Sequence, residues 1–315
     1  MEFNTEDLIN NHSYFVIVNP ASGNWGVKKK WDKIRTALEQ HISFSFEITA
    51  QPRHAEEIVQ RAIQKGYRKI IGIGGDGLLQ EIANGIVNQN EVDSTEITVC
   101  LISNGTGNDW IKTSGISKDL KQAIQALKTE KTIVQDLGKI TFTKDGKRQT
   151  RYCVNFAGVG FDSYVVANTL HLKKYGTIAY LLGMLQCLFS YKKPTLKISS
   201  AEKNITSAAY MCIAGVGKYG GGGMKLMPGA LLDDGKFFVS LAKDFSAPEV
   251  VMNIHKLYSG ELVTHPKVDS WETEKLYVKV IRSEDDVFIE ADGDVLGTGP
   301  FEIEIVPKKL KVIVS

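Results

Sequence analysis

The sequence predicts two domains, an α/β domain with a Rossmann-like parallel sheet over residues 1–135 and a mostly antiparallel β domain over residues 136–315. Three observations support this division. A chain of 315 residues with 43% hydrophobic residues is long enough for two hydrophobic cores. Short apolar segments alternate with helical patterns in the first part of the chain. From Ile133 onward, short β-rich segments separated by turns take their place.

Charge and cysteine content argue against several classes of protein. The formal net charge of +2 is close to zero for this length, so we expect no nucleic-acid partner. The four cysteines are widely spaced and form no Cys-x-x-Cys pair, which argues against a disulfide framework and a zinc site. Residues 1–12 are polar and acidic and lack the pattern of a secretory signal, so we expect a cytoplasmic protein.

The first domain is expected to alternate strands with helices. Apolar, β-rich segments predict strands, and apolar residues at helical spacing predict helices. The predicted strands are 14–18, 43–48, 69–74 and 97–102, and the predicted helices are 27–40, 54–65 and one that starts at Leu78. His54 opens one helix, where a lone histidine is more often a cap or surface residue than a catalytic group. The alternation indicates right-handed crossovers and a parallel sheet.

A glycine turn between a strand and a helix is the centre of this domain. Gly74, Gly75 and Gly77 would let the main chain approach a ligand, and the helix from Leu78 would offer unpaired amides to an anion such as phosphate. Asp76 would repel that phosphate unless a cation lay between them. We therefore interpret Asp76 as holding a nucleotide-bound Mg²⁺, directly or through water. The alternative is an ordinary turn in which Asp76 caps its own helix.

Two more polar loops follow strands of the same domain. Residues 19–23 follow the first predicted strand, and residues 103–109 follow the fourth. In open parallel sheets, ligands bind beyond the carboxyl ends of the strands. We therefore expect these two loops and the turn at 74–77 to lie at one edge of the sheet. Three such loops predict a nucleotide site more specifically than a single glycine motif does.

The second domain is expected to be rich in short strands. The predicted strands are 139–143, 151–156, 196–199, 208–213, 236–241, 276–282, 287–290 and 301–306. The main predicted helix, 175–191, is apolar but shorter than the roughly 20 residues that cross a bilayer. It either packs against the sheet or offers an apolar wall to a lipid, with Lys192 and Lys193 near the headgroups.

Six short segments, in their order along the chain, resemble the diacylglycerol kinase catalytic family, which includes bacterial YegS-like lipid kinases and is related to sphingosine kinases. The segments are Asn19-Pro20-x-Ser22-Gly23, Gly74-Gly75-Asp76-Gly77, Asn104 to Asp109, the segment from Asn155 to Asp162 with Pro228-x-Ala230-x-x-x-Asp234-Gly235, and Asp292-Gly293-Asp294. The resemblance runs nearly end to end. It implies a diacylglycerol kinase-like or NAD kinase-like first domain and a β-sandwich-like second domain.

The resemblance also implies which residues bind the cofactors. ATP would be bound by residues of the three loops and their surroundings, namely Asn19, Pro20, Ala21, Ser22, Gly23, Thr49, Gly74, Gly75, Asp76, Gly77, Leu78, Leu79, Gln80, Glu81, Asn104, Gly105, Thr106, Asn108 and Asp109. A structural Mg²⁺ would be held by the Asp234 carboxylate and the backbone carbonyls of Leu231 and Lys236. The alternative for this segment is a plain Asp-Gly hairpin turn.

Two departures from the family pattern bear on catalysis. The family usually reads Asp-Gly-Glu, so Asp294 inherits the role of proton acceptor, with Asp292 as the alternative and Asp76 as the third catalytic carboxylate. The family threonine after Gly-Gly-Asp-Gly is Leu78 here, which removes a hydroxyl able to bind phosphate. The resulting hypotheses are an ATP-dependent lipid kinase, a catalytically impaired regulator that binds nucleotide or lipid, and, less favoured, an NAD kinase.

The implied partner is a diacylglycerol-like or related lipid presented at a membrane surface. Peripheral contact with the inner face of the membrane is consistent with this reading, and so is a homodimer.

Overall fold

The computed structural model describes residues 13–105, 107–169, 183 and 186–315. The chain forms two compact units, one of residues 1–136 with 307–315 and one of residues 137–306. The sequence analysis placed all residues after 135 in the β domain, but the end of strand β14 (Asp294–Ile313) returns to the first unit. There Lys311 and Val312 pair in parallel with β4, and Leu310 is fully buried. Burial of the apolar side chains of Leu310 and Val312 explains why the chain returns to the first unit. The lysines next to them in the sequence hid this apolar pattern.

The first unit is built on a parallel sheet, as its sequence pattern predicts. Its strand order is β2-β1-β3-β4, with bounds Phe44–Ile48, Tyr14–Val18, Lys69–Gly74 and Thr98–Ser103. Every residue of β1 is buried, as are all but the first residue of β3 and of β4. Strands buried on both faces require a layer of helices on each side.

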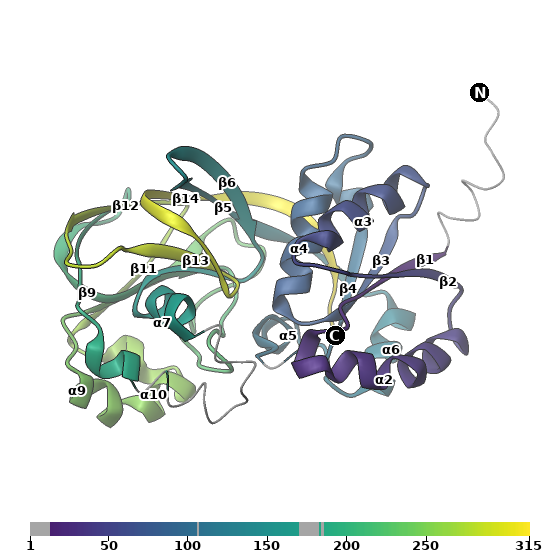
Figure 1. The fold of residues 1–315 in the computed structure, drawn as a ribbon, viewed down its shortest axis with the longest axis horizontal. Helices are drawn as coiled ribbons and strands as arrows, with labels where there is room; N and C mark the ends of the chain where they lie inside the picture. The colour runs from purple at the N-terminus through teal and green to yellow at the C-terminus, as the bar shows by residue number, and fades with distance from the viewer. Residues whose placement is uncertain (1–12, 106, 170–182, 184–185) are drawn as a thin grey trace. The chain divides into compact units, whose positions relative to one another are not determined.

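Helices supply those layers. They are α2 (Ser22–Glu39), α3 (His54–Gln64), α4 (Asp76–Val87), α5 (Asp109–Ser114) and α6 (Leu120–Thr129), with a 3₁₀ turn at Ser94–Glu96. Helices α3 and α4 lie on one face of the sheet, and α2 and α6 lie on the other (Figure 1). Gly23, Asn24 and Trp25 have left-handed backbone angles, so the regular part of α2 begins beyond them, near the predicted start at Val27.

The second unit consists mainly of antiparallel strands. They are β5 (Thr132–Lys144), β6 (Lys147–Cys153), β7 (Phe156–Gly160), β8 (Thr195–Ser199), β9 (Asn204–Gly215), β10 (Phe237–Lys243), β11 (Val268–Thr273), β12 (Lys275–Arg282), β13 (Phe288–Ala291) and the first part of β14. Six of them pair in a closed circuit, β9-β7-β13-β14-β12-β8 and back to β9. The long strands β9 and β14 pair with different neighbours along their lengths, and so connect the two sides of the circuit.

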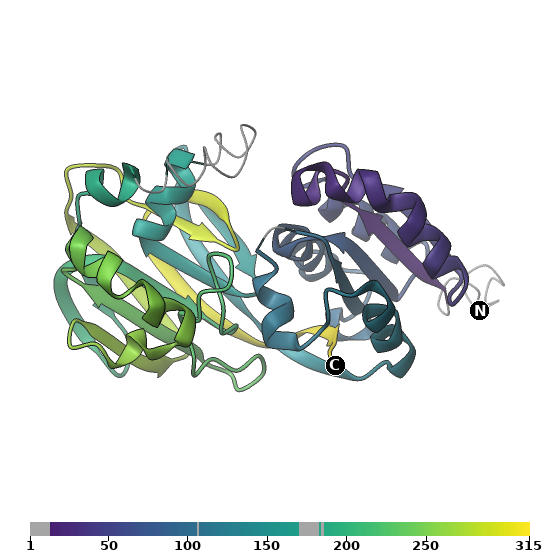
Figure 2. The ribbon, with the colours of Figure 1, turned by 90° about the horizontal axis from the view of Figure 1, so that it is seen from below.

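Helices of the second unit are short. They are α7 (Phe161–Thr169), α9 (Ala247–Met252) and α10 (Ile254–Ser259), followed by a 3₁₀ turn at Glu261–Thr264. Helices α9 and α10 are neighbours in the ribbon (Figure 2). Most of the predicted helix 175–191 lies outside the described residues, although its described end, 186–190, is helical. Within the described residues, no helix is both long enough and apolar enough to cross a membrane.

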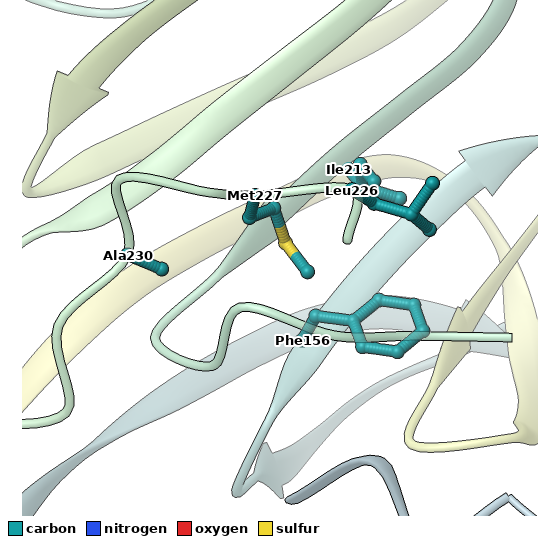
Figure 3. Close-up of a cluster of buried hydrophobic side chains, with 5 residues drawn as sticks. All are labelled: Phe156, Ile213, Leu226, Met227 and Ala230. Carbon is teal, nitrogen blue, oxygen red and sulfur yellow. The ribbon is translucent and has the colours of Figure 1, made fainter. Parts of the chain in front are cut away.

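A buried apolar cluster anchors the loop that leads to the predicted metal segment. Leu226, Met227 and Ala230 pack against Phe156 of β7 and Ile213 of β9 (Figure 3). Met227 is fully buried in this cluster. The packing fixes residues 226–230 on the sheet, immediately before the predicted metal segment.

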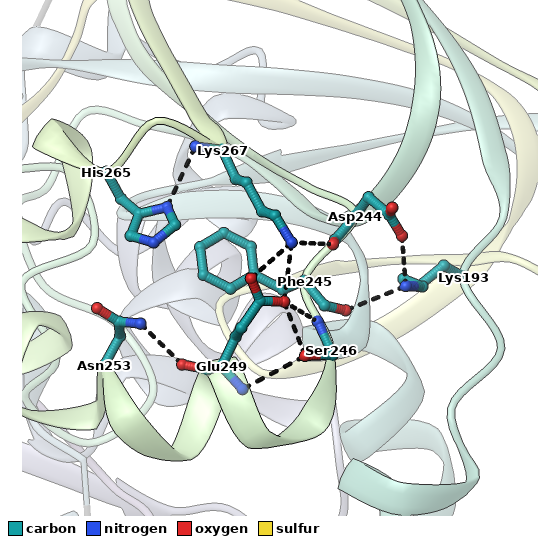
Figure 4. A network of polar contacts seen from close by, with 8 residues as sticks. All are labelled: Lys193, Asp244, Phe245, Ser246, Glu249, Asn253, His265 and Lys267. Carbon is teal, nitrogen blue, oxygen red and sulfur yellow. Dashed lines mark hydrogen bonds and ion pairs between the residues drawn. The ribbon is translucent and has the colours of Figure 1, made fainter.

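A polar network fixes the start of α9. The Ser246 side chain accepts a hydrogen bond from the Glu249 amide, and the Glu249 carboxylate accepts one from the Ser246 amide, which forms a capping box (Figure 4). Lys267 donates to both Glu249 oxygens at 2.6 and 2.8 Å. Lys267, together with the Ser246 hydrogen bonds, lowers the pKa of Glu249 to about 2.

Candidate active site

The three glycine loops of the first unit meet at the carboxyl edge of its sheet. The Asn19 amide donates to the Ile73 carbonyl at 3.0 Å, which ties the loop after β1 to the end of β3. The Asn104 amide donates to the Gly74 carbonyl at 2.7 Å, which ties the loop after β4 to the same place. The Lys30 ammonium reaches the Asn104 side-chain oxygen at 3.2 Å. Residues far apart in the sequence therefore form one loop cluster, as the strand pattern predicted.

Two kinds of glycine occur in this cluster. A Cβ on Gly105 would lie 2.8 Å from the Cα of Gly75, and a Cβ on Gly23 would lie 2.2 Å from the Asn104 carbonyl oxygen. Close approach of backbones explains why these two positions lack side chains. Gly77 is different, because a Cβ there would meet no atom within 4 Å. The packing around Gly77 thus leaves open space above the first turn of α4.

Asp76 bridges the turn after β3 and the start of α5. Its carboxylate accepts hydrogen bonds from the amides of Asp109 at 2.9 Å and Trp110 at 3.2 Å. Helix α4 has Gly75 at its N-cap and no side-chain cap, so the alternative in which Asp76 caps its own helix is wrong. Burial raises the pKa of Asp76, the two amides oppose this shift, and Asp109 adds to it.

A second carboxylate lies beside Asp76. A Cβ on Gly107 would lie 3.2 Å from an Asp109 oxygen and 3.5 Å from an Asp76 oxygen, so both carboxylates border the same space. Lys112 pairs with Asp109 at 3.0 Å. Two carboxylates next to open loops form a donor set that fits a hard divalent cation completed by water or phosphate oxygens.

Other predicted nucleotide residues have different surroundings. The Ser22 hydroxyl lies 3.5 Å from the position of a Cβ on Gly75, inside the loop cluster. Asn19 accepts from the Ala21 amide at 3.1 Å, which shapes the Pro20 turn. Thr49 follows β2 and is bonded through its amide to the Val18 carbonyl. The Asn108 amide group donates to the Gly105 carbonyl. Thr106 lies outside the described residues.

The side chains of residues 78–81 serve the fold. Leu78 is 2% exposed and lies over Gly74, where a Cβ would come within 2.6 Å of a Leu78 methyl group. Leu79 and Gln80 are fully buried. Glu81 accepts from the amides of Arg53 and Ala55 and so holds the first turn of α3. The resemblance implied that residues 78–81 belong to the ATP site. The side chains of Leu78, Leu79 and Gln80 are buried in the core, so only their backbone could face a nucleotide.

His54 opens α3 but does not cap it, because the N-cap residue is Arg53 and no side chain caps this helix. Its Nδ1 accepts from the Ala50 amide at 3.0 Å at the start of α3.

In the second unit, Asp292 and Asp294 occupy different environments. Asp292 is buried and accepts hydrogen bonds from the amides of Val154, Asn155 and Phe156 at 2.7, 3.0 and 3.1 Å. Asp294 is exposed, and its carboxylate accepts no hydrogen bond from the residues that the structure describes. Asp292 therefore stabilises the backbone at residues 154–156, whereas the exposed Asp294 carboxylate is free to accept a proton.

The predicted metal segment is an exposed turn. Asp234 accepts from the Lys236 amide at 3.1 Å, and Gly235 has a positive φ of 78°. Leu231 is 49% exposed. In the described parts of the chain, no group of three or more acidic, histidine or cysteine side chains could hold a metal. A cation here would therefore need backbone carbonyls and water beside the Asp234 carboxylate, which is a donor set that fits Mg²⁺.

Both units match known family models. The diacylglycerol kinase catalytic domain matches residues 13–140, and the YegS C-terminal NAD kinase beta sandwich-like domain matches residues 155–314. The chain belongs to the diacylglycerol kinase and YegS-like lipid kinase family. The resemblance found in the sequence is thus confirmed.

Individual relatives of this lipid kinase family member cover most of the chain. A Bacillus subtilis protein named as a lipid kinase, YtlR, is 27% identical over 95% of this chain and 98% of its own. A "Probable lipid kinase YegS-like" from Pseudomonas syringae pv. tomato is 30% identical over 73% of this chain and 72% of its own. A crystal structure of a diacylglycerol kinase from Bacillus anthracis has a TM-score of 0.70 at 20% identity, and covers 96% of this chain and 97% of that one. The last similarity describes the fold alone.

Sequence reasoning gave no role to two acidic residues of this family member. Glu290 accepts from the Gly293 amide at 2.8 Å, next to Asp292 and Asp294. Asp162 lies within a motif that carried the resemblance. The sequence signal that could have identified Glu290 is its position as an acidic residue within the apolar segment 287–291.

Proposed function

We propose that this protein transfers the γ-phosphate of ATP to a hydroxyl group of a diacylglycerol-like lipid. The observation that carries the proposal is the meeting of three glycine loops around Asp76, with open space above Gly77. Loops of this kind expose backbone amides to phosphate groups. The family match supports a lipid as the acceptor.

In this proposal, the first unit binds and orients the nucleotide. The amides of Asp76 and Gly77, in the first turn of α4, have no acceptor within their own helix and would bind phosphate oxygens. Ser22 and Lys30 add a hydroxyl and a cation from the loop cluster. A Mg²⁺ bound to the nucleotide would neutralise phosphate charge, and Asp76 and Asp109 are the residues that would hold it. Asp234, with the carbonyls of Leu231 and Lys236, would hold a structural Mg²⁺.

Asp294 accepts the proton of the lipid hydroxyl in this scheme. The hydroxyl oxygen forms a bond to the γ-phosphorus, the bond from that phosphorus to the β–γ bridging oxygen breaks, and ADP leaves. The hydroxyl proton passes to Asp294, whose carboxylate is exposed. Asp292 is occupied by three amides and holds the turn.

The test is transfer of labelled γ-phosphate from ATP, with Mg²⁺, to lipids in mixed micelles. The panel contains diacylglycerol, monoacylglycerol, ceramide, sphingosine and phosphatidylglycerol, with NAD as an aqueous control. Label in diacylglycerol supports the proposal, and label in another lipid replaces the acceptor. Label in NAD alone, or ATP binding without transfer to any acceptor, contradicts it.

A further inference from the structure

Two buried carboxyl groups of the second unit lie side by side. Glu290 of β13 is directly opposite Gly158 of β7 in an antiparallel pair, so their side-chain positions share one face about 5 Å apart. Gly158 has no side chain, and an Asp162 oxygen fills that position, 1.6 Å from where a Gly158 Cβ would be. The Asp162 carboxyl group is thereby placed next to Glu290, with Ile213 of β9 on its other side.

Among the residues that the structure describes, the charged neighbours that act most strongly on Glu290 are carboxylates and not cations. Glu290 is 2% exposed, and neither carboxylate oxygen of Asp162 has a hydrogen-bond partner within the described part of the chain. The carboxylates that act on Glu290 are those of Asp162, Asp292 and Asp294. Two carboxyl groups that share a buried site cannot both ionise without a large penalty.

Three other titratable groups of the described chain that interact with the pair stay neutral near pH 7. Burial raises the pKa of the Cys212 thiol on β9, of the Cys153 thiol on β6 and of the Tyr191 hydroxyl. Burial also raises the pKa of Asp162, which the nearby amides of Ser163 and Asp162 oppose only in part. Burial and then Asp162 raise the pKa of Glu290 well above its ordinary value.

Glu290 is connected to the proposed proton acceptor. Its Oε2 accepts from the Gly293 amide at 2.8 Å, within the turn Asp292-Gly293-Asp294. Asp292 and Gly293 both have left-handed φ values, 48° and 92°, so this turn needs support from its neighbours. Asp292 supports one side of the turn and Glu290 the other, and Asp294 follows at once.

We propose that Asp162 and Glu290 hold one proton between them, and that Glu290, through the Gly293 amide, positions the Asp294 carboxylate for phosphoryl transfer. Asp162 and Glu290 are positioning residues, because neither is argued to touch the reacting atoms. The role in catalysis rests on the proposed function, whereas the shared proton does not. Loss of that proton at alkaline pH leaves two buried charges beside each other and releases the turn.

The catalytic part is tested by kcat and KM against pH for wild type, Glu290→Gln, Glu290→Ala and the control Glu302→Gln, an ion-paired residue of β14. The kcat of the wild type is expected to fall at alkaline pH, where the shared proton is lost. Glu290→Gln can still accept a hydrogen bond from the Gly293 amide but cannot ionise, so its kcat stays within about threefold of the wild type at neutral pH and does not fall at alkaline pH. Glu290→Ala lowers kcat by about tenfold or more with KM for ATP little changed. An unchanged pH profile in Glu290→Gln, or equal losses of kcat and ATP affinity in Glu290→Ala, overturns the positioning role.

The shared proton is tested without activity, by thermal unfolding of wild type and Asp162→Asn at several pH values. A carboxyl group with a raised pKa binds its proton more tightly in the folded state. Its contribution to the stability of the folded state therefore declines as the pH rises from about 4, where carboxyl groups of the unfolded chain titrate, through the pKa of the group in the folded protein. The Tm of Asp162→Asn relative to wild type is expected to rise by about 3 °C or more between pH 5 and pH 8. A constant Tm difference overturns the shared proton, even if no lipid is phosphorylated.

Discussion

Replacing Asp292 or Asp294 with asparagine should separate a structural carboxylate from a catalytic one. In Asp292→Asn, the new NH₂ group would face the Val154 amide, which now donates to Asp292 at 2.7 Å. One unpaired buried amide costs about 1–3 kcal/mol, and the two remaining bonds lose charge assistance worth about 1 kcal/mol each. The expected loss is about 3 kcal/mol or more, which lowers the Tm by roughly 6 °C or more for a unit of this size.

Asp294→Asn should show the opposite pattern. Asp294 is exposed, so the substitution changes stability by less than about 0.5 kcal/mol. Removal of a general base lowers kcat by about 100-fold or more, and KM for ATP stays within about twofold because the proposed nucleotide site is formed by loops of the first unit. Label transfer at saturating lipid gives kcat, and differential scanning fluorimetry gives the Tm. Normal turnover in Asp294→Asn, or an unchanged Tm in Asp292→Asn, would refute the reasoning.

Three further predictions concern other parts of the chain. Gly77→Ala places a methyl group in open space, so the Tm is unchanged or higher while KM for ATP rises about tenfold; equal KM values would show that no ligand approaches this position. Because the Leu78 side chain is buried, Leu78→Thr lowers the free energy of unfolding by about 2 kcal/mol in urea titrations and does not raise kcat. A higher kcat at unchanged stability contradicts this prediction. The ionised Glu249 carboxylate stabilises the folded state above pH 4.5, and this stabilisation is lost as the pH falls toward about 2. Glu249→Gln removes it, so the urea midpoints of variant and wild type are expected to converge at low pH. A difference that stays constant with pH argues against the Lys267 pair.

The parallel sheet and the loop cluster could be predicted because both depend on local patterns. Strands such as 14–18 are continuous apolar segments, and their carboxyl ends must lie at one edge of a parallel sheet. The roles of individual side chains could not be predicted in the same way. Leu78 and Asp76 are two residues apart on one helix, and only the direction in which that helix packs sends one into the core and the other toward α5.

Long-range pairing was the main obstacle in the second unit. Strands β9 and β14 are longer than their apolar segments, because each pairs with one set of neighbours and then with another. Strand β11 was missed because only Val268 and Trp271 of its six residues are apolar, and their spacing of three gives no alternation of the kind that predicts a strand. The Asp162 and Glu290 pair depends on a glycine on a neighbouring strand, a relation that no sequence spacing reveals.

The return of β14 to the first unit has a consequence for biosynthesis. A ribosome makes residues 13–136 long before residues 307–315, yet Lys311 and Val312 pair with Thr98 and Val99 in the finished sheet. The edge of β4 that pairs with β14 therefore stays without this partner strand while the second unit is synthesised. Exposed strand edges invite pairing with other chains. Chains that lack residues 307–315 are therefore expected to bind chaperones through the uncovered edge of β4 in the first unit.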